Sequence, residues 1–133
     1  MNKTTFKKQK AELMYNLYQY DLFSDLNQAN DANSVTEENQ DTYQKIIANL
    51  ANIDQAIEDN LYNYSLNRLS FVDRAIIRLA TYELLYTDYP ISFILNDAID
   101  LTKKYSNLDD DKQRKFNNKL LDTIAKAVRK DQK

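Results

Sequence analysis

Two groups of cationic and aromatic side chains near the ends of this chain are the residues best suited to bind another molecule. The N-terminal group consists of Lys3, Lys7, Lys8, Lys10, Tyr15, Tyr18 and Tyr20. Ammonium groups pair with phosphates and aromatic faces stack on nucleobases, so this combination is typical of a surface that binds single-stranded RNA. A basic helix face that contacts only water remains the alternative.

The second group lies near the C-terminus and consists of Lys112, Arg114, Lys115, Lys119 and Phe116. Residues 1–20 carry four lysines and one acid, and residues 109–133 carry eight basic and five acidic residues. Residues 21–62 carry nine acids and one lysine, so the net charge of −2 conceals two basic ends around an acidic middle. If the fold brings these ends together, they form a local patch that attracts anions.

Catalytic and metal-binding residues are not indicated. The one acidic run is Asp109, Asp110 and Asp111. Three adjacent carboxylates cannot all converge on one ion, and they are favourable at a helix start because they face the positive end of the helix dipole. Catalytic pairing of Glu83 with another acid is not indicated either, because nothing in the sequence marks a raised pKa or a cleft there. We therefore expect a protein that is not an enzyme and has no metal site.

Missing residue types exclude further kinds of site. The chain has no Cys, no His and no Gly. Disulfides and the usual zinc sites need Cys or His, and phosphate-binding loops need the backbone freedom of Gly. No cofactor is expected. Since no long apolar run occurs and the N-terminus is polar, the sequence predicts a cytoplasmic protein.

The spacing of apolar residues predicts helices over residues 4–23, 43–64, 71–86, 90–105 and 110–130, and no strand. Ser34 with Glu37, and Ser70 with Asp73, have the spacing of helix starts. The helix over 71–86 is apolar almost all round and belongs at the centre, with Arg74 and Arg78 extending outward to water. Residues 24–34 read as a loop. The predicted fold class is an all-α helical bundle.

Four segments in this order resemble the NusB family. Residues 67–84, NRLSFVDRAIIRLATYEL, are similar to the signature of that family and are followed by Tyr89 and Pro90. Residues 95–103, LNDAIDLTK, resemble its INEAIELAK pattern, and residues 115–122, KFNNKLLD, resemble its KFVNGVLD pattern. Residues 7–19 resemble the basic motif that leads into the first helix of the family.

The resemblance implies one NusB-like domain of two helical subdomains, about 1–66 and 67–133. It implies a transcription antitermination factor that pairs with the ribosomal protein NusE, binds the boxA element of nascent RNA and helps RNA polymerase to transcribe ribosomal RNA. The free protein would be a monomer or a homodimer. Carried over by position, Asp73 would face NusE, and the RNA contacts would be Lys7, Lys8, Lys10, Tyr18, Lys115 and Phe116.

Two other functions stay open. NusB-like domains also accompany the catalytic domain of certain ribosomal RNA methyltransferases, so an accessory module without its own RNA specificity is one alternative. A helical module that binds only proteins is the other. The basic motif of the family is rich in Arg, whereas here it contains only Lys. Lys lacks the planar fork with which Arg holds a phosphate, which predicts weaker or less selective phosphate binding.

Overall fold

Helices make up all the regular structure in residues 3–25, 35–62, 64–106 and 111–129, which are the residues that this computed structural model describes. The α-helices are α1 (Lys3–Asp25), α2 (Glu37–Ala48), α3 (Leu50–Glu58), α4 (Phe71–Tyr86), α5 (Ile91–Tyr105) and α6 (Lys112–Val128), and the 3-10 helix η2 spans Leu66–Arg68. The predicted all-α fold is confirmed. None of the helices in these ranges has the length and apolar character needed to cross a membrane.

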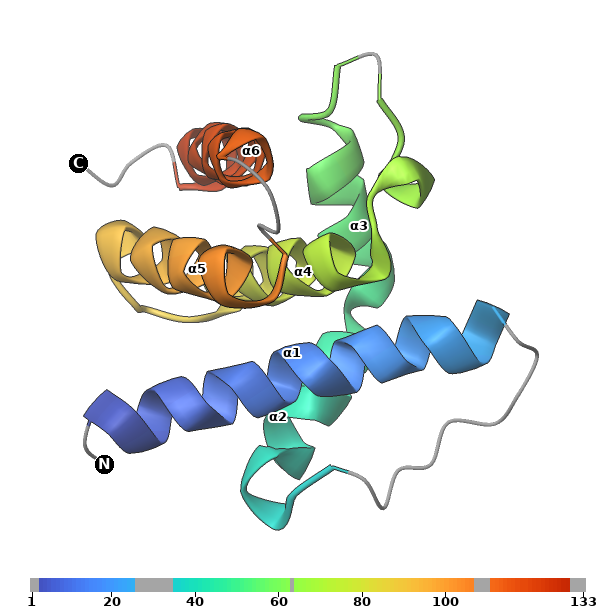
Figure 1. Ribbon diagram of the computed structural model, residues 1–133, viewed down its shortest axis with the longest axis vertical. Helices are drawn as coiled ribbons and strands as arrows, with labels where there is room; N and C mark the ends of the chain where they lie inside the picture. The colour runs from blue at the N-terminus through green and yellow to red at the C-terminus, as the bar shows by residue number, and fades with distance from the viewer. Residues whose placement is uncertain (1–2, 26–34, 63, 107–110, 130–133) are drawn as a thin grey trace.

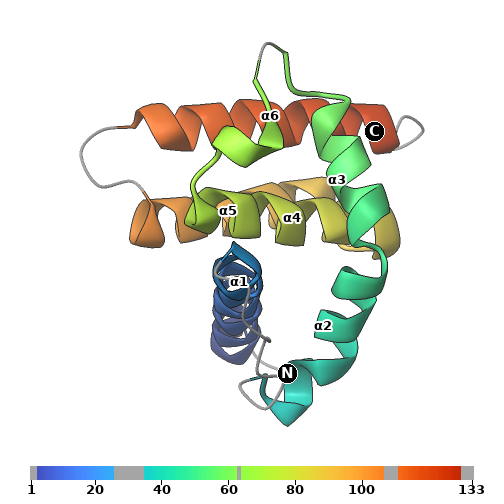
Figure 2. The same ribbon diagram turned by 90° about the vertical axis from the view of Figure 1, so that its right-hand side faces the viewer.

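Helices α4 and α5 form a central layer, with α6 on one face and α1 on the other (Figures 1 and 2). Helix α3 packs along α4, and α2 lies beside α1. One hydrophobic core extends through the whole arrangement, from Leu17 of α1 and Ile53 of α3 to Ile124 of α6. The proposed division at residue 66 stays a prediction, and α1 packs closely on α4 across it.

Helix α4 lies at the centre of the fold, packed against α1, α3, α5 and α6. Every one of its residues from Asp73 to Leu84 is therefore buried. Its start follows the predicted pattern, since the Ser70 hydroxyl accepts a hydrogen bond from the Asp73 N–H at 3.1 Å and so caps the helix. The prediction that Arg74 and Arg78 extend outward to water was wrong, because both are buried. On a helix covered on all sides, a guanidinium cannot reach bulk water and must find carboxylates instead.

Arg78 joins three helices through two carboxylates. Its Nη1 donates to both oxygens of Asp21 at 2.8 and 2.9 Å, and its Nε and Nη2 donate to Asp54 at 2.8 and 2.9 Å. Burial alone would lower the pKa of Arg78, but the hydrogen bonds and charges of Asp54 and Asp21 raise it above its ordinary value. Arg74 Nη1 lies 3.5 Å from the same Asp21 carboxylate.

The predicted helix over 43–64 is two helices. The chain bends at Asn49, which has φ −108° and ψ 13° and whose side-chain amide donates to the Lys45 carbonyl at 2.8 Å. This side-chain hydrogen bond competes with the backbone hydrogen bonds of the helix, as those of Asn often do. The bend places α2 against α1 and α3 against α4. Helix α2 has Thr36 as its N-cap residue, without a side-chain hydrogen bond, and Ser34 lies outside the described residues.

Arg129 donates hydrogen bonds to backbone carbonyls at the C-terminal end of α4. Its guanidinium donates to the carbonyls of Leu84 at 2.8 Å, Glu83 at 2.9 Å and Thr87 at 2.7 Å. The last carbonyls of a helix have no partner within the helix and carry partial negative charge, so a buried cation is favourable there. This contact fixes the end of α6 to the connection between α4 and α5.

Candidate RNA interface

The exposed lysines of α1 lie beside the C-terminal end of α5. Lys7 and Lys8 are both exposed, and the Lys7 Nζ lies 3.4 Å from an Asp100 carboxylate oxygen. Because the Lys7–Asp100 ion pair is open to solvent, it contributes little to stability, and Lys7 can pair with a phosphate in place of Asp100. Lys7 and Lys104 line one hollow of about 280 Å³ between α1 and α5.

A larger groove of about 670 Å³ continues along α1 and carries aromatic rings. It is lined by Lys8, Tyr15, Tyr18 and Tyr105 among other residues. The rings of Tyr15 and Tyr18 are stacked, with centroids 6.1 Å apart and planes at 20°. Tyr15 is 55% exposed and Tyr105 is 41% exposed, so both faces of the groove offer a ring to a planar ligand.

Lys10 points away from this surface into the core. It is 4% exposed, and its Nζ lies 2.7 Å from Asp97 and 3.0 Å from Glu83. The rings of Phe6 and Phe93 also lie 5.5 and 5.3 Å from it. Its charge is therefore occupied by two buried carboxylates from α4 and α5, and in this geometry Lys10 holds α1 to the central layer instead of offering a free cation.

The same cluster makes Glu83 sensitive to pH. Burial raises the pKa of Glu83 to about 7, the charge of Asp97 adds to this, and Lys10 opposes it. One ammonium between two carboxylates is neutral overall only when one carboxyl holds a proton, which is consistent with that direction. This raised pKa could not be predicted from the sequence, because Lys10, Glu83 and Asp97 lie far apart along the chain.

We expect the free energy of unfolding to fall as the pH rises from about 5 to about 7. The folded protein keeps a proton on Glu83 that the unfolded chain, with an ordinary pKa of 4.5, has released. The stabilisation is complete below the unfolded pKa and is lost through the folded pKa; it amounts to about 3 kcal/mol in full, of which roughly 2 kcal/mol is lost between pH 5 and pH 7. The chain has no His to titrate in this range. Urea unfolding at several pH values measures the effect, and Glu83→Gln should flatten the curve; an unchanged slope in that variant contradicts the assignment.

Asp73, the residue expected to face a protein partner, is 4% exposed and forms an internal hub. Its carboxylate accepts hydrogen bonds from Ser70 at 2.7 Å, Ser106 at 2.6 Å and Asn117 at 3.0 Å. Asn117 also donates to Thr102 at 3.2 Å. Asp73 thus ties the start of α4 to the end of α5 and to α6, and it positions the end of α5 that carries Lys103, Lys104 and Tyr105.

Asn117→Leu should destabilise the protein by about 2 kcal/mol. Asn117 is completely buried, and leucine leaves the Asp73 carboxylate with one donor fewer in a site that water does not reach. Thermal unfolding followed by circular dichroism measures the loss. Asn118→Leu is the matched control, because Asn118 is the exposed neighbour on the same helix, and it should change little. Equal losses in the two variants would rule out the hub.

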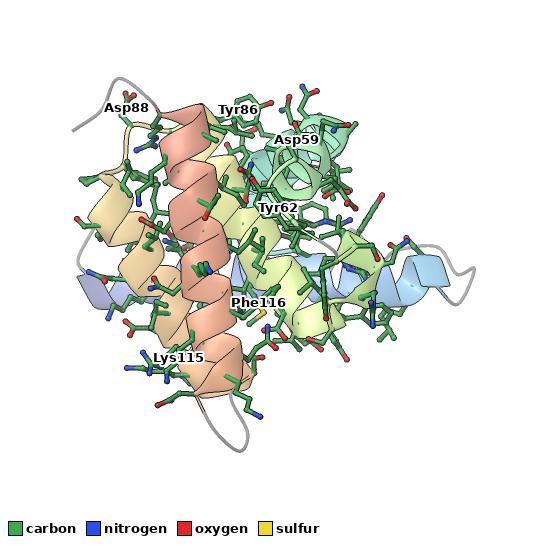
Figure 3. The ribbon with its side chains drawn as sticks, turned by 90° about the horizontal axis from the view of Figure 1, so that it is seen from above. Asp59, Tyr62, Tyr86, Asp88, Lys115 and Phe116 are labelled. Atoms are coloured by element: carbon green, nitrogen blue, oxygen red, sulfur yellow. The ribbon has the colours of Figure 1, made fainter. Side chains whose placement is uncertain are left out.

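Lys115 and Phe116 of α6 point to different sides of their helix (Figure 3). Lys115 is exposed, whereas Phe116 is partly buried with its ring 5.4 Å from that of Tyr64. Because α1 and α6 lie on opposite faces of the central layer, the two basic segments are not side by side. The C-terminal end of α5 lies between α1 and α6, so its lysines, Lys103 and Lys104, lie between the two basic segments.

Lys103, Lys104 and Tyr105 at the end of α5 were not predicted as site residues. All three are exposed; Lys104 and Tyr105 line the hollows beside α1, and the Lys104 ammonium lies 5.4 Å from the Tyr105 ring. The sequence did contain a sign of this surface, because two lysines and a tyrosine end the predicted helix over residues 90–105. It could equally indicate cations placed against the negative end of the helix dipole, so only the fold separates the two readings.

Asp111 is the one residue of the acidic run 109–111 that the structure describes, and it pairs with an arginine. It precedes α6, accepts from Arg114 Nε at 3.3 Å and pairs with Arg114 Nη2 at 3.1 Å. The hydrogen bond from Arg114 lowers the pKa of Asp111, and the charges of Lys115 and Lys103 act in the same direction. Asp109 and Asp110 lie outside the described residues. Within the described part of the chain, no group of three acidic side chains could hold a metal ion.

The sequence and the fold both match one known family. The model of the NusB family matches residues 2–126. The chain belongs to the NusB family. A solved structure of NusB from T. maritima has a TM-score of 0.74 to this fold at 32% sequence identity, and the match covers 90% of this chain and 89% of that one. The resemblance found in the four sequence segments is confirmed.

Three relatives share the name transcription antitermination protein NusB. The transcription antitermination protein NusB of Pseudothermotoga lettingae is 47% identical over 89 residues, or 66% of this chain. That of Campylobacter jejuni is 42% identical over 85 residues, and that of Fervidobacterium nodosum is 35% identical over 119 residues, or 88% of this chain. The matches span 61%, 62% and 81% of these relatives, respectively. The name that these three relatives share is that of a transcription antitermination protein.

Proposed function

We propose that this protein is a non-enzymatic transcription antitermination factor that binds single-stranded RNA of the boxA type together with NusE while ribosomal RNA is transcribed. In this proposal the protein acts in the cytoplasm, beside RNA polymerase. Membership of the NusB family and the name that its relatives carry support the proposal at the level of the family. The RNA contacts rest on the chain's own surface.

One observation carries the RNA contact: cations and tyrosines from α1 and α5 line two adjoining hollows, which share Ala11 and Tyr105. Lys7 and Lys8 come from α1, Lys104 and Tyr105 come from α5, and stacked Tyr15 and Tyr18 line the same surface. The ammonium groups can pair with successive phosphates while the rings stack on bases, and neither contact changes the RNA chemically. Lys115 extends the cationic surface beyond the end of α5.

Compared with the sequence-based set, the proposed contacts keep Lys7, Lys8, Tyr18 and Lys115 and add Tyr15 and the end of α5. We leave out Lys10, because its ammonium is buried between two carboxylates. Phe116 of α6 is partly buried against Tyr64 and stays a proposed contact outside this surface. Asp73 is buried, so we propose that it supports the NusE surface by holding α4, α5 and α6 together and not by direct contact.

Fluorescence anisotropy with labelled boxA RNA tests this function. We expect binding that weakens steeply with salt, that is stronger for boxA than for a scrambled RNA of equal length, and that tightens when NusE is added. Equal weak binding to both RNAs, unchanged by NusE, contradicts it. NusE binding without any RNA binding would instead favour a module that contacts only proteins.

A further inference from the structure

A buried charge cluster borders the proposed RNA surface. Lys10 lines the hollow of about 280 Å³ that carries Lys7 and Lys104, and it also lines a second cavity, of about 270 Å³, to which α1, α2 and α4 contribute. It is the one residue that the described linings of these two spaces share. Glu83 lines the second cavity. Lys10 therefore contacts Glu83 on one side and borders the proposed RNA surface on the other.

The cluster changes its net charge when Glu83 takes up a proton. The Lys10 Nζ lies 2.7 Å from Asp97 and 3.0 Å from Glu83, and all three side chains are buried. One ammonium and two carboxylates sum to a charge of −1, and a proton on Glu83 makes the sum zero. The titratable and charged groups that face Glu83 from its own helix and the surrounding elements are Lys10 of α1, Glu38 of α2, Tyr82 of α4, Tyr89 after α4, Asp97 of α5 and Arg129 after α6. The charge of Arg129 favours ionised Glu83 less than that of Lys10 does, so the balance rests mainly on Lys10.

Glu83 changes its charge close to neutral pH. Burial raises the pKa of Glu83 to about 7, Lys10 opposes this, and the charge of Asp97 adds to it. The cavity beside Glu83 has room for water, so a proton can reach the carboxyl in the folded protein. The chain has no His, the residue whose ordinary pKa would place another change of side-chain charge in this range. The charge that borders the RNA surface therefore depends on Glu83 near neutral pH.

We propose that RNA binding and protonation of Glu83 are coupled, so that the chain binds single-stranded RNA more tightly while Glu83 is neutral. The inference rests on the proposed RNA-binding function and adds a regulation to it. A phosphate that pairs with Lys7 or Lys104 brings negative charge next to the cluster, which is less favourable when the cluster is already negative. Because coupling is reciprocal, RNA binding then draws a proton onto Glu83. Glu83 acts through Lys10 and through its own charge, and it does not contact the RNA.

The pH dependence of RNA affinity tests the coupling. Fluorescence anisotropy with boxA RNA, at constant salt and with a dye that does not titrate, should show about threefold weaker binding at pH 8 than at pH 6 for the native chain. Glu83→Gln keeps a neutral side chain of the same shape at every pH, so its affinity should be equal at the two pH values. Glu38→Gln is the matched control, because Glu38 lines the same cavity but is exposed, and it should keep the native dependence. Circular dichroism at both pH values checks that the fold is kept.

The outcomes separate the coupling from the proposed function. Equal native affinity at pH 6 and pH 8, with boxA still preferred to a scrambled RNA, overturns the coupling and leaves the proposed function intact. An equal fall in the native chain and in Glu83→Gln also overturns it, because another group, such as the N-terminal amine, is then responsible. Absence of RNA binding at both pH values contradicts the coupling and the proposed function together.

Calorimetry on the native protein provides a test that needs no variant. RNA with a 5′-hydroxyl end is titrated into the chain at pH 7 in two buffers that differ in ionisation enthalpy, and the difference in heat gives the number of protons taken up for each RNA bound. We expect uptake of a fraction of one proton, since the bases and the internal phosphates of RNA do not titrate near this pH. Zero uptake, or release of a proton, overturns the coupling.

Discussion

Replacing Lys7 and Lys8 together by alanine should weaken the binding of boxA RNA on the order of thirtyfold at low salt. Each lysine that neutralises a phosphate releases a counterion, so its loss also lowers the slope of log affinity against log salt by about 0.7 for single strands. Both residues are exposed, and Lys7 has one solvent-open partner, Asp100 at 3.4 Å. The double variant should therefore keep its fold, which circular dichroism can check.

The matched control for this pair is Lys45→Ala with Lys126→Ala. Both lysines are exposed, lie on α2 and α6 outside the groove, and carry the same total charge. If RNA affinity depended only on net charge, the two double variants would lose the same affinity. That result would contradict the proposed surface. We expect the control to keep nearly all its affinity. Lys7→Arg with Lys8→Arg should increase affinity, because Arg can hold a phosphate through two hydrogen bonds.

Arg78→Met should cost about 3–5 kcal/mol of unfolding free energy. The substitution removes four hydrogen bonds and leaves the buried Asp21 carboxylate with Arg74, at 3.5 Å, as its remaining ion pair in the described structure. Removing one partner of a buried pair is costly because the remaining charge cannot return to water. Urea unfolding followed by circular dichroism measures the loss.

A second variant separates lost charge pairing from lost packing at Arg78. Adding Asp21→Leu to Arg78→Met removes the unpaired carboxylate and should recover part of the stability, because a buried ion pair can often be replaced by apolar residues at little cost. Recovery is incomplete because Arg74 then has no ion pair in the described structure and keeps its hydrogen bonds to the Asn67 and Leu69 carbonyls. Asp54→Asn should cost less than Arg78→Met, since the Asp54 side chain is 27% exposed and partly solvated. No recovery in the double variant would show that packing, and not the unpaired charge, explains the loss.

The helices could be predicted from periodicity, because apolar residues at helical spacing determine where each one lies. The predicted helix over residues 71–86 has the observed bounds, since Ser70 caps its start and apolar residues recur on all its sides as far as Tyr86. The bend at Asn49 was missed because α2 and α3 continue one apolar stripe, and a single side-chain hydrogen bond to Lys45 interrupts it. Such a local competition leaves no mark in the hydrophobic pattern.

Charged residues were harder to place than apolar ones. Lys10 and Lys8 are two positions apart in the same basic motif, yet one is buried and the other exposed. Arg78 looked like a surface residue because its two acids, Asp21 and Asp54, lie 57 and 24 positions away along the chain. Type and spacing identify a cation, whereas its partner is determined by which helices meet.

The sequence identified the basic and aromatic composition of the proposed interface but not its geometry. Both basic ends were found by counting charges, yet α1 and α6 lie on opposite faces of the central layer. Lys104 and Tyr105 complete the surface because α5 ends between α1 and α6. Nothing in their local sequence separates that role from an ordinary helix end, so the third contributor required the fold.

The central claim is that single-stranded RNA lies on the groove between α1 and the end of α5. Titrating the isotope-labelled protein with boxA RNA, and following its backbone amides by two-dimensional NMR, tests this most directly. The largest shifts should fall on the first half of α1, from Lys7 to Tyr18, and on Lys103 to Tyr105. Shifts confined to α2 and α3, with α1 and α5 unchanged, would contradict it.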